Sequence, residues 1–233
     1  MAWTNAQLTD AVAKGLGKLR VRADAAPMQR YMKTEQPFYG VKKPGRVVLM
    51  RDVKKRFVPT SRRQYESAVR ALWKQPHREE RYVALLYARA FDDFVAAESI
   101  PLFETLMVQG AWWDLVDELA VQVVGRVWLR DRAAVEPWAD RWIASDDMWL
   151  RRAAIIGQVK HKGETDEGRL FSFCRARMHE KEFFIRKGIG WALRAYSYDA
   201  PDAVIAFLRA HEGELSPLSF REGAKGMVRE GRM

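Results

Sequence analysis

The sequence predicts an all-α protein built from short helices stacked in pairs. In nearly every long segment, apolar residues recur at three- and four-residue spacing, which is the period of one helix face. No segment shows strand alternation or a hairpin turn. The helical segments come in pairs at a period of roughly forty residues, typical of HEAT-type repeats. We therefore expect a curved α-solenoid of HEAT-like repeats with a concave face, which would be basic because the chain has an excess of Lys and Arg.

Individual helices can be placed from periodicity and from their end signals. The clearest helical segments are residues 64–73, 78–91, 100–108, 112–129, 149–160, 167–178 and 183–195. Ser61 and the run Ser145-Asp146-Asp147 precede such segments, as helix N-cap residues do. Gly and Pro predict breaks at residues 37–40, 44–45, 59–61, 109–110, 162–163 and 213–217.

The domain organisation expected from the sequence is simple. No Pro/Ser/Gly-rich linker or low-complexity tract interrupts the chain, so residues 1–233 are expected to form a single HEAT-like repeat domain. The basic, glycine-containing tail of residues 225–233 is expected to fray.

Composition limits the classes of partner and site. Forty Lys and Arg against thirty Asp and Glu give a formal net charge of +10, which favours a polyanionic partner. The chain has one cysteine, and its four histidines lack ligand spacing, so we expect neither a disulfide nor a metal, and no cofactor. The sequence has no signal-peptide pattern and no apolar run long enough to span a membrane. We therefore expect an intracellular, cytoplasmic protein that does not bind membranes.

Two helical segments combine aromatic and charged residues. In the first, Trp113 and Asp117 lie four residues apart and so share one helix face. An unpaired carboxylate is costly in a core, but beside an indole it suits a site that receives positive charge. In the second segment, Arg152 follows Trp149 by about one turn, and Lys160 lies about two turns further along a similar face. The alternative interpretation of Asp117 is a structural salt bridge or a helix cap.

A third segment places Lys187, Trp191 and Arg194 on one helical stripe. Gly188 and Gly190 weaken that helix, so they are expected to let another backbone or a ligand come close. Most tryptophans are expected to pack between helices, and Cys174 is expected to be a small buried residue. The tryptophans assigned to the core are Trp73, Trp112, Trp128, Trp138, Trp142 and Trp149.

These segments, taken in order, resemble the AlkD-like DNA alkylation repair enzymes, which are HEAT-repeat DNA glycosylases. The resemblance spans about residues 24–225. It is carried by residues 28–33 (Met-Gln-Arg-Tyr-Met-Lys), 112–117 (Trp-Trp-Asp-Leu-Val-Asp), 142–146 (Trp-Ile-Ala-Ser-Asp), 149–155 (Trp-Leu-Arg-Arg-Ala-Ala-Ile), 181–185 (Lys-Glu-Phe-Phe-Ile), 190–191 (Gly-Trp) and 217–222 (Pro-Leu-Ser-Phe-Arg-Glu). The chain departs from the family pattern in being more basic at residues 42–43, 54–56 and 62–63.

The resemblance implies a helical superhelix that holds duplex DNA and hydrolyses the N-glycosidic bond of cationic N3- and N7-alkylated purines. By the family's pattern, Asp117 is the catalytic carboxylate, Trp113 and Trp191 are the active-site aromatics, and Arg152 is the phosphate-side arginine. Tyr31 matches an aromatic residue contributed by the N-terminal helices. The expected enzyme is monofunctional, works without base flipping and acts as a monomer on DNA containing alkylated bases.

Lys160, Lys187 and Arg194 are expected to extend the contact along the DNA backbone. The sequence is also compatible with two other functions. A non-catalytic HEAT-repeat protein could bind damaged or branched DNA. A protein–protein scaffold also suits the predicted fold, but leaves the net charge and the pairing of Asp117 with Trp113 unexplained.

Overall fold

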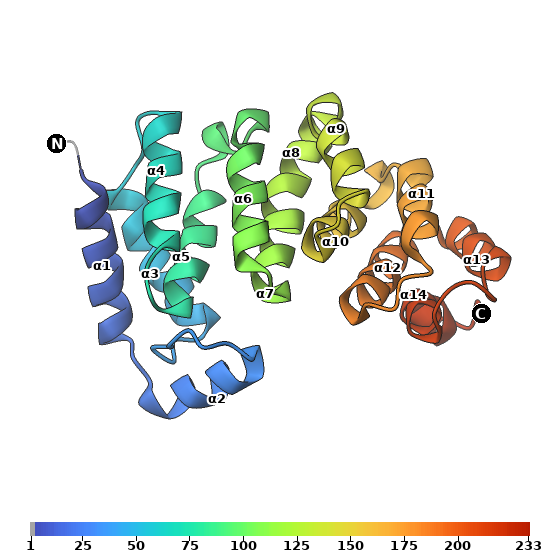
Figure 1. Ribbon diagram of the computed structural model, residues 1–233, viewed down its shortest axis with the longest axis horizontal. Coiled ribbons are helices and arrows are strands. Elements are labelled where there is room, and N and C mark those ends of the chain that lie inside the picture. Colours follow the sequence, from blue (N-terminus) through green and yellow to red (C-terminus); the bar gives the residue numbers. More distant parts are fainter. Residues whose placement is uncertain (1–2) are drawn as a thin grey trace. The chain divides into compact units, whose positions relative to one another are not determined.

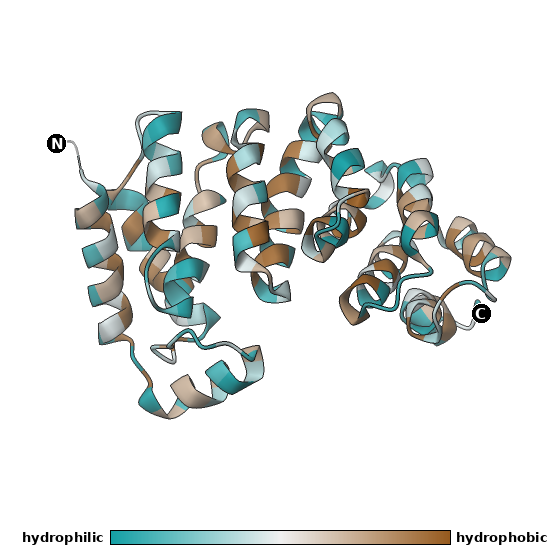
Figure 2. Ribbon diagram, in the orientation of Figure 1, coloured by the Kyte–Doolittle hydropathy of each residue, from teal (hydrophilic) through white to brown (hydrophobic). Residues whose placement is uncertain are grey.

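The computed structural model describes residues 3–233 and divides into two compact units, Met1–Val95 and Ala96–Met233. Within the described residues, both units consist of helices joined by turns, and neither contains a strand. The predicted all-α class is therefore confirmed. Hydrophilic and hydrophobic residues alternate around the helices, as expected for helices that bury one face (Figure 2).

Unit 1 places four helices side by side and sets a fifth apart from them (Figure 1). Its helices are α1 (Asn5–Lys18), α2 (Arg22–Met32), α3 (Lys43–Arg56), α4 (Arg62–Trp73) and α5 (Arg78–Ala88), followed by the 3₁₀ turn η1 (Asp92–Phe94). The core lies between α1, α3, α4 and α5, where Leu8, Tyr65 and Tyr87 are fully buried. Helix α2 buries none of its residues.

Unit 2 begins with a 3₁₀ turn and continues as packed helices. Its elements are η2 (Ala97–Ser99), α6 (Ile100–Gly110), α7 (Trp113–Asp117), η3 (Glu118–Val124), α8 (Gly125–Arg130), α9 (Arg132–Ile143), α10 (Met148–Ile156), η4 (Lys162–Glu164), α11 (Glu167–Arg177), α12 (Phe183–Tyr196), α13 (Pro201–Ala210) and α14 (Pro217–Arg229). The helix expected over residues 112–129 is present, but its middle, η3, is a π-helical segment. Such a wide turn is uncommon and often occurs at functional sites.

Both predicted N-caps are confirmed. The Ser61 hydroxyl accepts a hydrogen bond from the Gln64 amide at the start of α4. The Asp147 carboxylate accepts from the amides of Trp149 and Leu150 at the start of α10. In each case the side chain satisfies backbone N–H groups that the first helical turn leaves without a partner.

Two local predictions are wrong. The break expected at residues 44–45 is instead the first turn of α3, where proline is tolerated because its missing N–H has no helical partner there. Residues 225–229 of the tail expected to fray belong to α14, because Met227 is buried and anchors that turn. Beyond the helix, the Arg232 guanidinium donates to the Asp202 carboxylate at 3.0 Å.

The expected core is largely confirmed. Trp73, Trp128, Trp142 and Trp149 are buried. Trp112 and Trp138 are only half-buried, so their assignment to the core is corrected. Cys174 is fully buried, and burial raises the pKa of its thiol to about 12.

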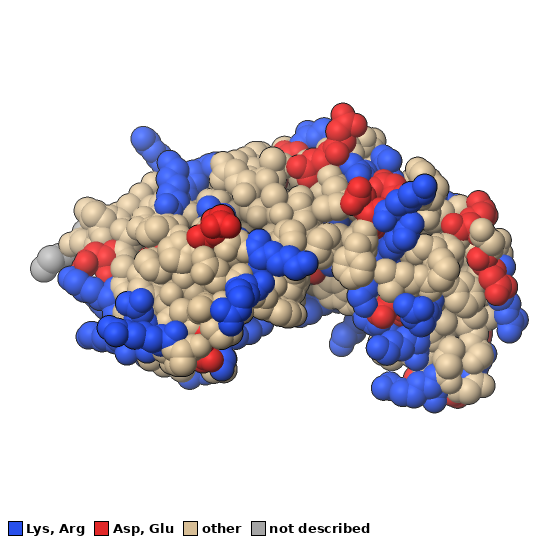
Figure 3. Space-filling model, turned by 60° about the horizontal axis from the view of Figure 1, so that its bottom comes forward, with Lys and Arg blue, Asp and Glu red and all other residues tan. Residues whose placement is uncertain are grey.

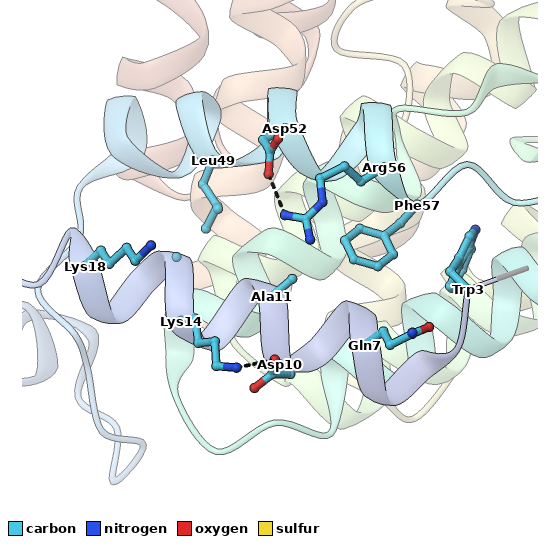
Figure 4. Close-up of a pocket in the computed structure, with 11 residues that line it drawn as sticks. Trp3, Gln7, Asp10, Ala11, Lys14, Lys18, Leu49, Asp52, Arg56 and Phe57 are labelled. Carbon is cyan, nitrogen blue, oxygen red and sulfur yellow. Dashed lines mark hydrogen bonds and ion pairs between the residues drawn. The ribbon is translucent and has the colours of Figure 1, made fainter. Parts of the chain in front are cut away.

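A groove of about 910 Å³ runs between α1 and α3 of unit 1 (Figure 4). Ion pairs within each helix, Asp10–Lys14 and Asp52–Arg56, lie along its sides, and the Phe57 ring lies near one end. None of the predicted site residues lines this groove, although Arg56 belongs to the basic run of residues 54–56. Among residues 3–233, no helix is both long and apolar enough to cross a bilayer.

Candidate active site

Asp117 and Arg152 form a bidentate ion pair in unit 2. Asp117 is the last residue of α7, and Arg152 lies in the middle of α10. The Arg152 Nε donates to Asp117 Oδ1 and Nη2 donates to Oδ2, both at 2.8 Å. Two parallel charge-assisted hydrogen bonds fix the plane of the carboxylate as well as its position.

Arg152 also connects the pair to α12. Its Nη1 donates to the backbone carbonyl of Phe184. A Cβ added at Gly188 would lie 3.2 Å from that nitrogen, so glycine leaves room for the guanidinium. Gly188 was expected to admit another backbone or a ligand, whereas here it admits a side chain; the expected close backbone approach occurs at Gly190, against Ser219. Arg152 therefore ties α7, α10 and α12 together from a side chain that is only 6% exposed.

Asp117 is mostly buried but keeps an opening to solvent, since its side chain is 19% exposed. Burial raises the pKa of the Asp117 carboxyl above its ordinary value of 3.8, and the nearby Asp114 carboxylate adds to this effect. The two hydrogen bonds and the positive charge of Arg152 act in the opposite direction. The site thus holds a carboxylate that is poorly solvated and accessible, with its orientation set by a guanidinium.

An aromatic cluster lies beside this ion pair. The Phe184 ring centroid lies 4.9 Å from that of Trp149 and 5.4 Å from that of Trp112. The Arg152 guanidinium carbon lies 5.9 Å from the Phe184 ring centroid. Trp112, which was expected in the core, is half-buried, and so is Phe184. The signal that could have identified them is their place in the motifs of residues 112–117 and 181–185.

The predicted indoles lie in the same unit as the ion pair. Trp113 begins α7 one turn before Asp117, and Trp191 lies in α12. Both are half-buried, so each keeps some ring surface accessible. Tyr31 lies in the other unit, on α2, and is 71% exposed. The structure therefore brings Asp117 and Arg152 into direct contact, and leaves Trp113, Trp191 and Tyr31 at least partly exposed.

Lys187 and Arg194 of α12 both form ion pairs with Glu222 of α14. Glu222 Oε1 lies 2.9 Å from the Lys187 Nζ, and Oε2 lies 2.6 Å from the Arg194 Nη1. Hydrogen bonds from Lys187 and Arg194 lower the pKa of Glu222 to about 2, against the opposing effect of burial. No local pattern predicts this pairing, because Glu222 follows Arg194 by 28 residues.

The family model of the DNA alkylation repair enzyme matches residues 12–227. The chain belongs to this family. A solved structure, the predicted DNA alkylation repair enzyme from Enterococcus faecalis, is 28% identical over 90% of this chain and 97% of that chain, with a TM-score of 0.78. This likeness confirms the expected helical-repeat fold. No match was found among the curated proteins.

The surface of this DNA alkylation repair enzyme is rich in cations. On the face shown in Figure 3, Lys and Arg cover more area than Asp and Glu. The predicted contact residue Lys160 is exposed, and its Nζ donates to the Gln122 side chain in η3 at 2.8 Å. Among residues 3–233, no group of three or more His, Cys, Asp and Glu side chains is arranged to hold a metal ion.

Proposed function

We propose that this family member is a DNA glycosylase. It hydrolyses the N-glycosidic bond of cationic N3- and N7-alkylated purines in duplex DNA. The observation that carries the proposal is Asp117, a poorly solvated carboxylate whose plane is fixed by Arg152 and whose side chain remains 19% exposed. A carboxylate held in this way is prepared to stabilise positive charge that develops next to it.

The chemistry needs no general acid. An alkylated purine already carries a positive charge, so the electrons of the C1′–N bond leave with the base and neutralise it. Positive charge then develops on the deoxyribose as the bond stretches. Asp117 stabilises this charge and orients a water molecule, whose oxygen bonds to C1′ as one of its protons passes to the surrounding water. The low local polarity around Asp117 strengthens this interaction, because fewer water dipoles compete with it.

Arg152 acts mainly as a positioning residue in this mechanism. Three of its donor contacts go to Asp117 and to the Phe184 carbonyl. A guanidinium has five N–H groups, so the predicted phosphate contact would have to use the N–H groups that do not bond to Asp117 or Phe184. The positive charge of Arg152 also favours the ionised form of Asp117, which the mechanism requires.

The aromatic residues bind the cationic lesion and the sugar. Trp113, Trp191 and Tyr31 would present ring faces, and each such contact contributes about 0.5–2 kcal/mol. Lys160, Lys187 and Arg194 would contact backbone phosphates. No sequence motif supplies a lysine as a Schiff-base nucleophile, so we propose a monofunctional enzyme that does not cut the strand. It would work as a cytoplasmic monomer without a metal or cofactor, and without flipping the base.

An excision assay tests the proposal. Wild-type protein is expected to release 7-methylguanine or 3-methyladenine from methylated duplex DNA. In Asp117→Asn, the rate of base release is expected to fall at least a hundredfold while duplex binding persists. Removing a group that stabilises transition-state charge typically lowers the rate by about 10²–10³. Asp146→Asn is the matched control, because Asp146 is exposed and its loss changes the net charge equally. Wild-type turnover in Asp117→Asn would falsify the mechanism.

One observation favours the alternative of a non-catalytic protein that binds damaged or branched DNA. Both carboxylate oxygens of Asp117 already accept hydrogen bonds from Arg152, as they would in a purely structural ion pair. The same assay separates the two functions. A binding protein would retain alkylated or branched duplex and release no base at any enzyme concentration.

A further inference from the structure

We propose that Glu222 is an internal counterion that withholds Lys187 and Arg194 from DNA and thereby limits the affinity for the duplex. This inference rests on the proposed DNA-binding function and deepens it. It concerns α12 and α14 of unit 2 and does not involve the ion pair of Asp117. The sequence predicts that Lys187 and Arg194 contact the DNA backbone, whereas the structure gives both of them a partner within the protein.

A glycine in α12 makes the space that Glu222 occupies. Gly190 lies between Lys187 and Arg194 on the same side of the helix, and α14 approaches it closely. A Cβ added at Gly190 would lie 2.5 Å from the Glu222 Cβ and 3.0 Å from the Ser219 carbonyl oxygen. The missing side chain of Gly190 therefore lets Glu222 reach one cation in the preceding turn and one in the following turn.

The carboxylate is permanently charged at neutral pH, because its two cationic neighbours lower its pKa to about 2. Its side chain is 14% exposed, while those of Lys187 and Arg194 are 40% and 25% exposed. The two cations thus face solvent with part of their surface, yet one negative charge lies between them. A DNA phosphate that approaches either cation meets the negative charge of Glu222 as well.

This arrangement has a measurable consequence for salt dependence. Each cation that neutralises a backbone phosphate releases condensed counterions, which steepens the slope of log K against log salt by about 0.9. Cations held by Glu222 contribute little to that slope. Removing the charge of Glu222 should make both available and strengthen duplex binding.

The experiment compares wild type with Glu222→Gln in duplex-binding titrations from 50 to 300 mM salt. For each cation released in the variant, the slope of log K against log salt is expected to steepen by about 0.9. The affinity for duplex at 0.1 M salt is expected to rise on the order of eightfold. Glu212→Gln is the matched control. Glu212 is exposed in the same unit, and its loss changes the net charge equally. Glu212→Gln is expected to leave the slope unchanged.

A double-mutant cycle keeps the test informative if Glu222→Gln lowers the stability of the α12–α14 contact. Lys187→Gln is expected to weaken duplex binding less than twofold in wild type, and several-fold in the Glu222→Gln background. Equal effects in both backgrounds, or an unchanged slope in Glu222→Gln, would overturn the inference and leave Glu222 as a structural link between two helices. Failure of the wild-type protein to bind any duplex would instead overturn the proposed function.

Discussion

The guanidinium of Arg152 and the carboxylate of Asp117 share two hydrogen bonds, although 35 residues separate them in the chain. The pair joins the end of α7 to the middle of α10. It determines which way the candidate catalytic carboxylate points, so the stability of this region and its chemistry depend on the same contact.

Loss of Arg152 is expected to destabilise the fold. Arg152→Ala leaves Asp117 mostly buried without its partner, and removing one member of a buried pair costs about 3–5 kcal/mol. Since Asp117 is 19% exposed, we expect a decrease of about 3 kcal/mol in the free energy of unfolding, measured by urea denaturation.

Arg141→Ala serves as the control for this variant. Arg141 is 57% exposed and pairs with Glu104 at the surface, so its loss is expected to cost no more than about 1 kcal/mol. Equal destabilisation by the two variants would contradict the structural role given to Arg152.

The pH dependence of base release should report the environment of Asp117. Burial raises the pKa of this carboxyl, and the mechanism needs its ionised form. Activity should therefore fall with decreasing pH at a higher pH than for an ordinary aspartate. In Arg152→Gln, the guanidinium no longer lowers the pKa, so the acid limb should move to still higher pH.

The sign of the stability effect is opposite to that of an ordinary salt-bridged aspartate. Because folding raises the pKa of Asp117, the folded state binds the proton more tightly than the unfolded chain does. Ionisation of Asp117 thus lowers stability as pH rises between the two pKa values.

The control for the pH dependence of base release is Asp146→Asn, which should leave the pH–rate profile of kcat/KM unchanged. An acid limb at the same pH in wild type and Arg152→Gln would argue against Asp117 as the titrating group.

Gly190→Ala is expected to force α12 and α14 apart. The added Cβ would meet the Ser219 carbonyl oxygen at 3.0 Å, and backbone cannot move aside as a flexible side chain can. We expect a loss of about 1–3 kcal/mol in thermal or urea unfolding. Gly17→Ala in α1 is the control, since a Cβ there meets nothing within 4 Å. It should be stabilising by up to about 1 kcal/mol, because alanine favours helix. A neutral Gly190→Ala variant would show that the two helices do not need this close approach.

Tyr31→Ala is expected to affect DNA without affecting folding. Tyr31 is 71% exposed on a helix that buries none of its residues, so the melting temperature should stay constant. A lost ring contact of about 0.5–2 kcal/mol corresponds to a decrease in kcat/KM of roughly twofold to thirtyfold on alkylated duplex. Tyr198→Ala, which removes another tyrosine that is 60% exposed, should leave kcat/KM unchanged. If the two variants behave alike, Tyr31 has no specific role.

Local pattern was enough to predict the helical class, the N-caps at Ser61 and Asp147, and the shared face of Trp113 and Asp117. These features depend on residues within about one or two helical turns, where the period of the helix determines which side chains are neighbours. The break predicted at residues 44–45 failed for a related reason. Proline signals a helix start as readily as a helix end, and only the packing of α3 in unit 1 decides between them.

What the sequence determined by itself was therefore the helices, the excess of positive charge and the identity of the residues able to do chemistry. Only the tertiary structure decided which charges meet. Asp117 could have faced solvent or another cation, and Lys187 and Arg194 could have lacked an acidic partner. Helix packing at Gly188 and Gly190 brings Arg152 and Glu222 within reach of α12. The physical reason is that ion pairs between helices depend on how closely the backbones approach, and the periodicity of one helix carries no information about that distance.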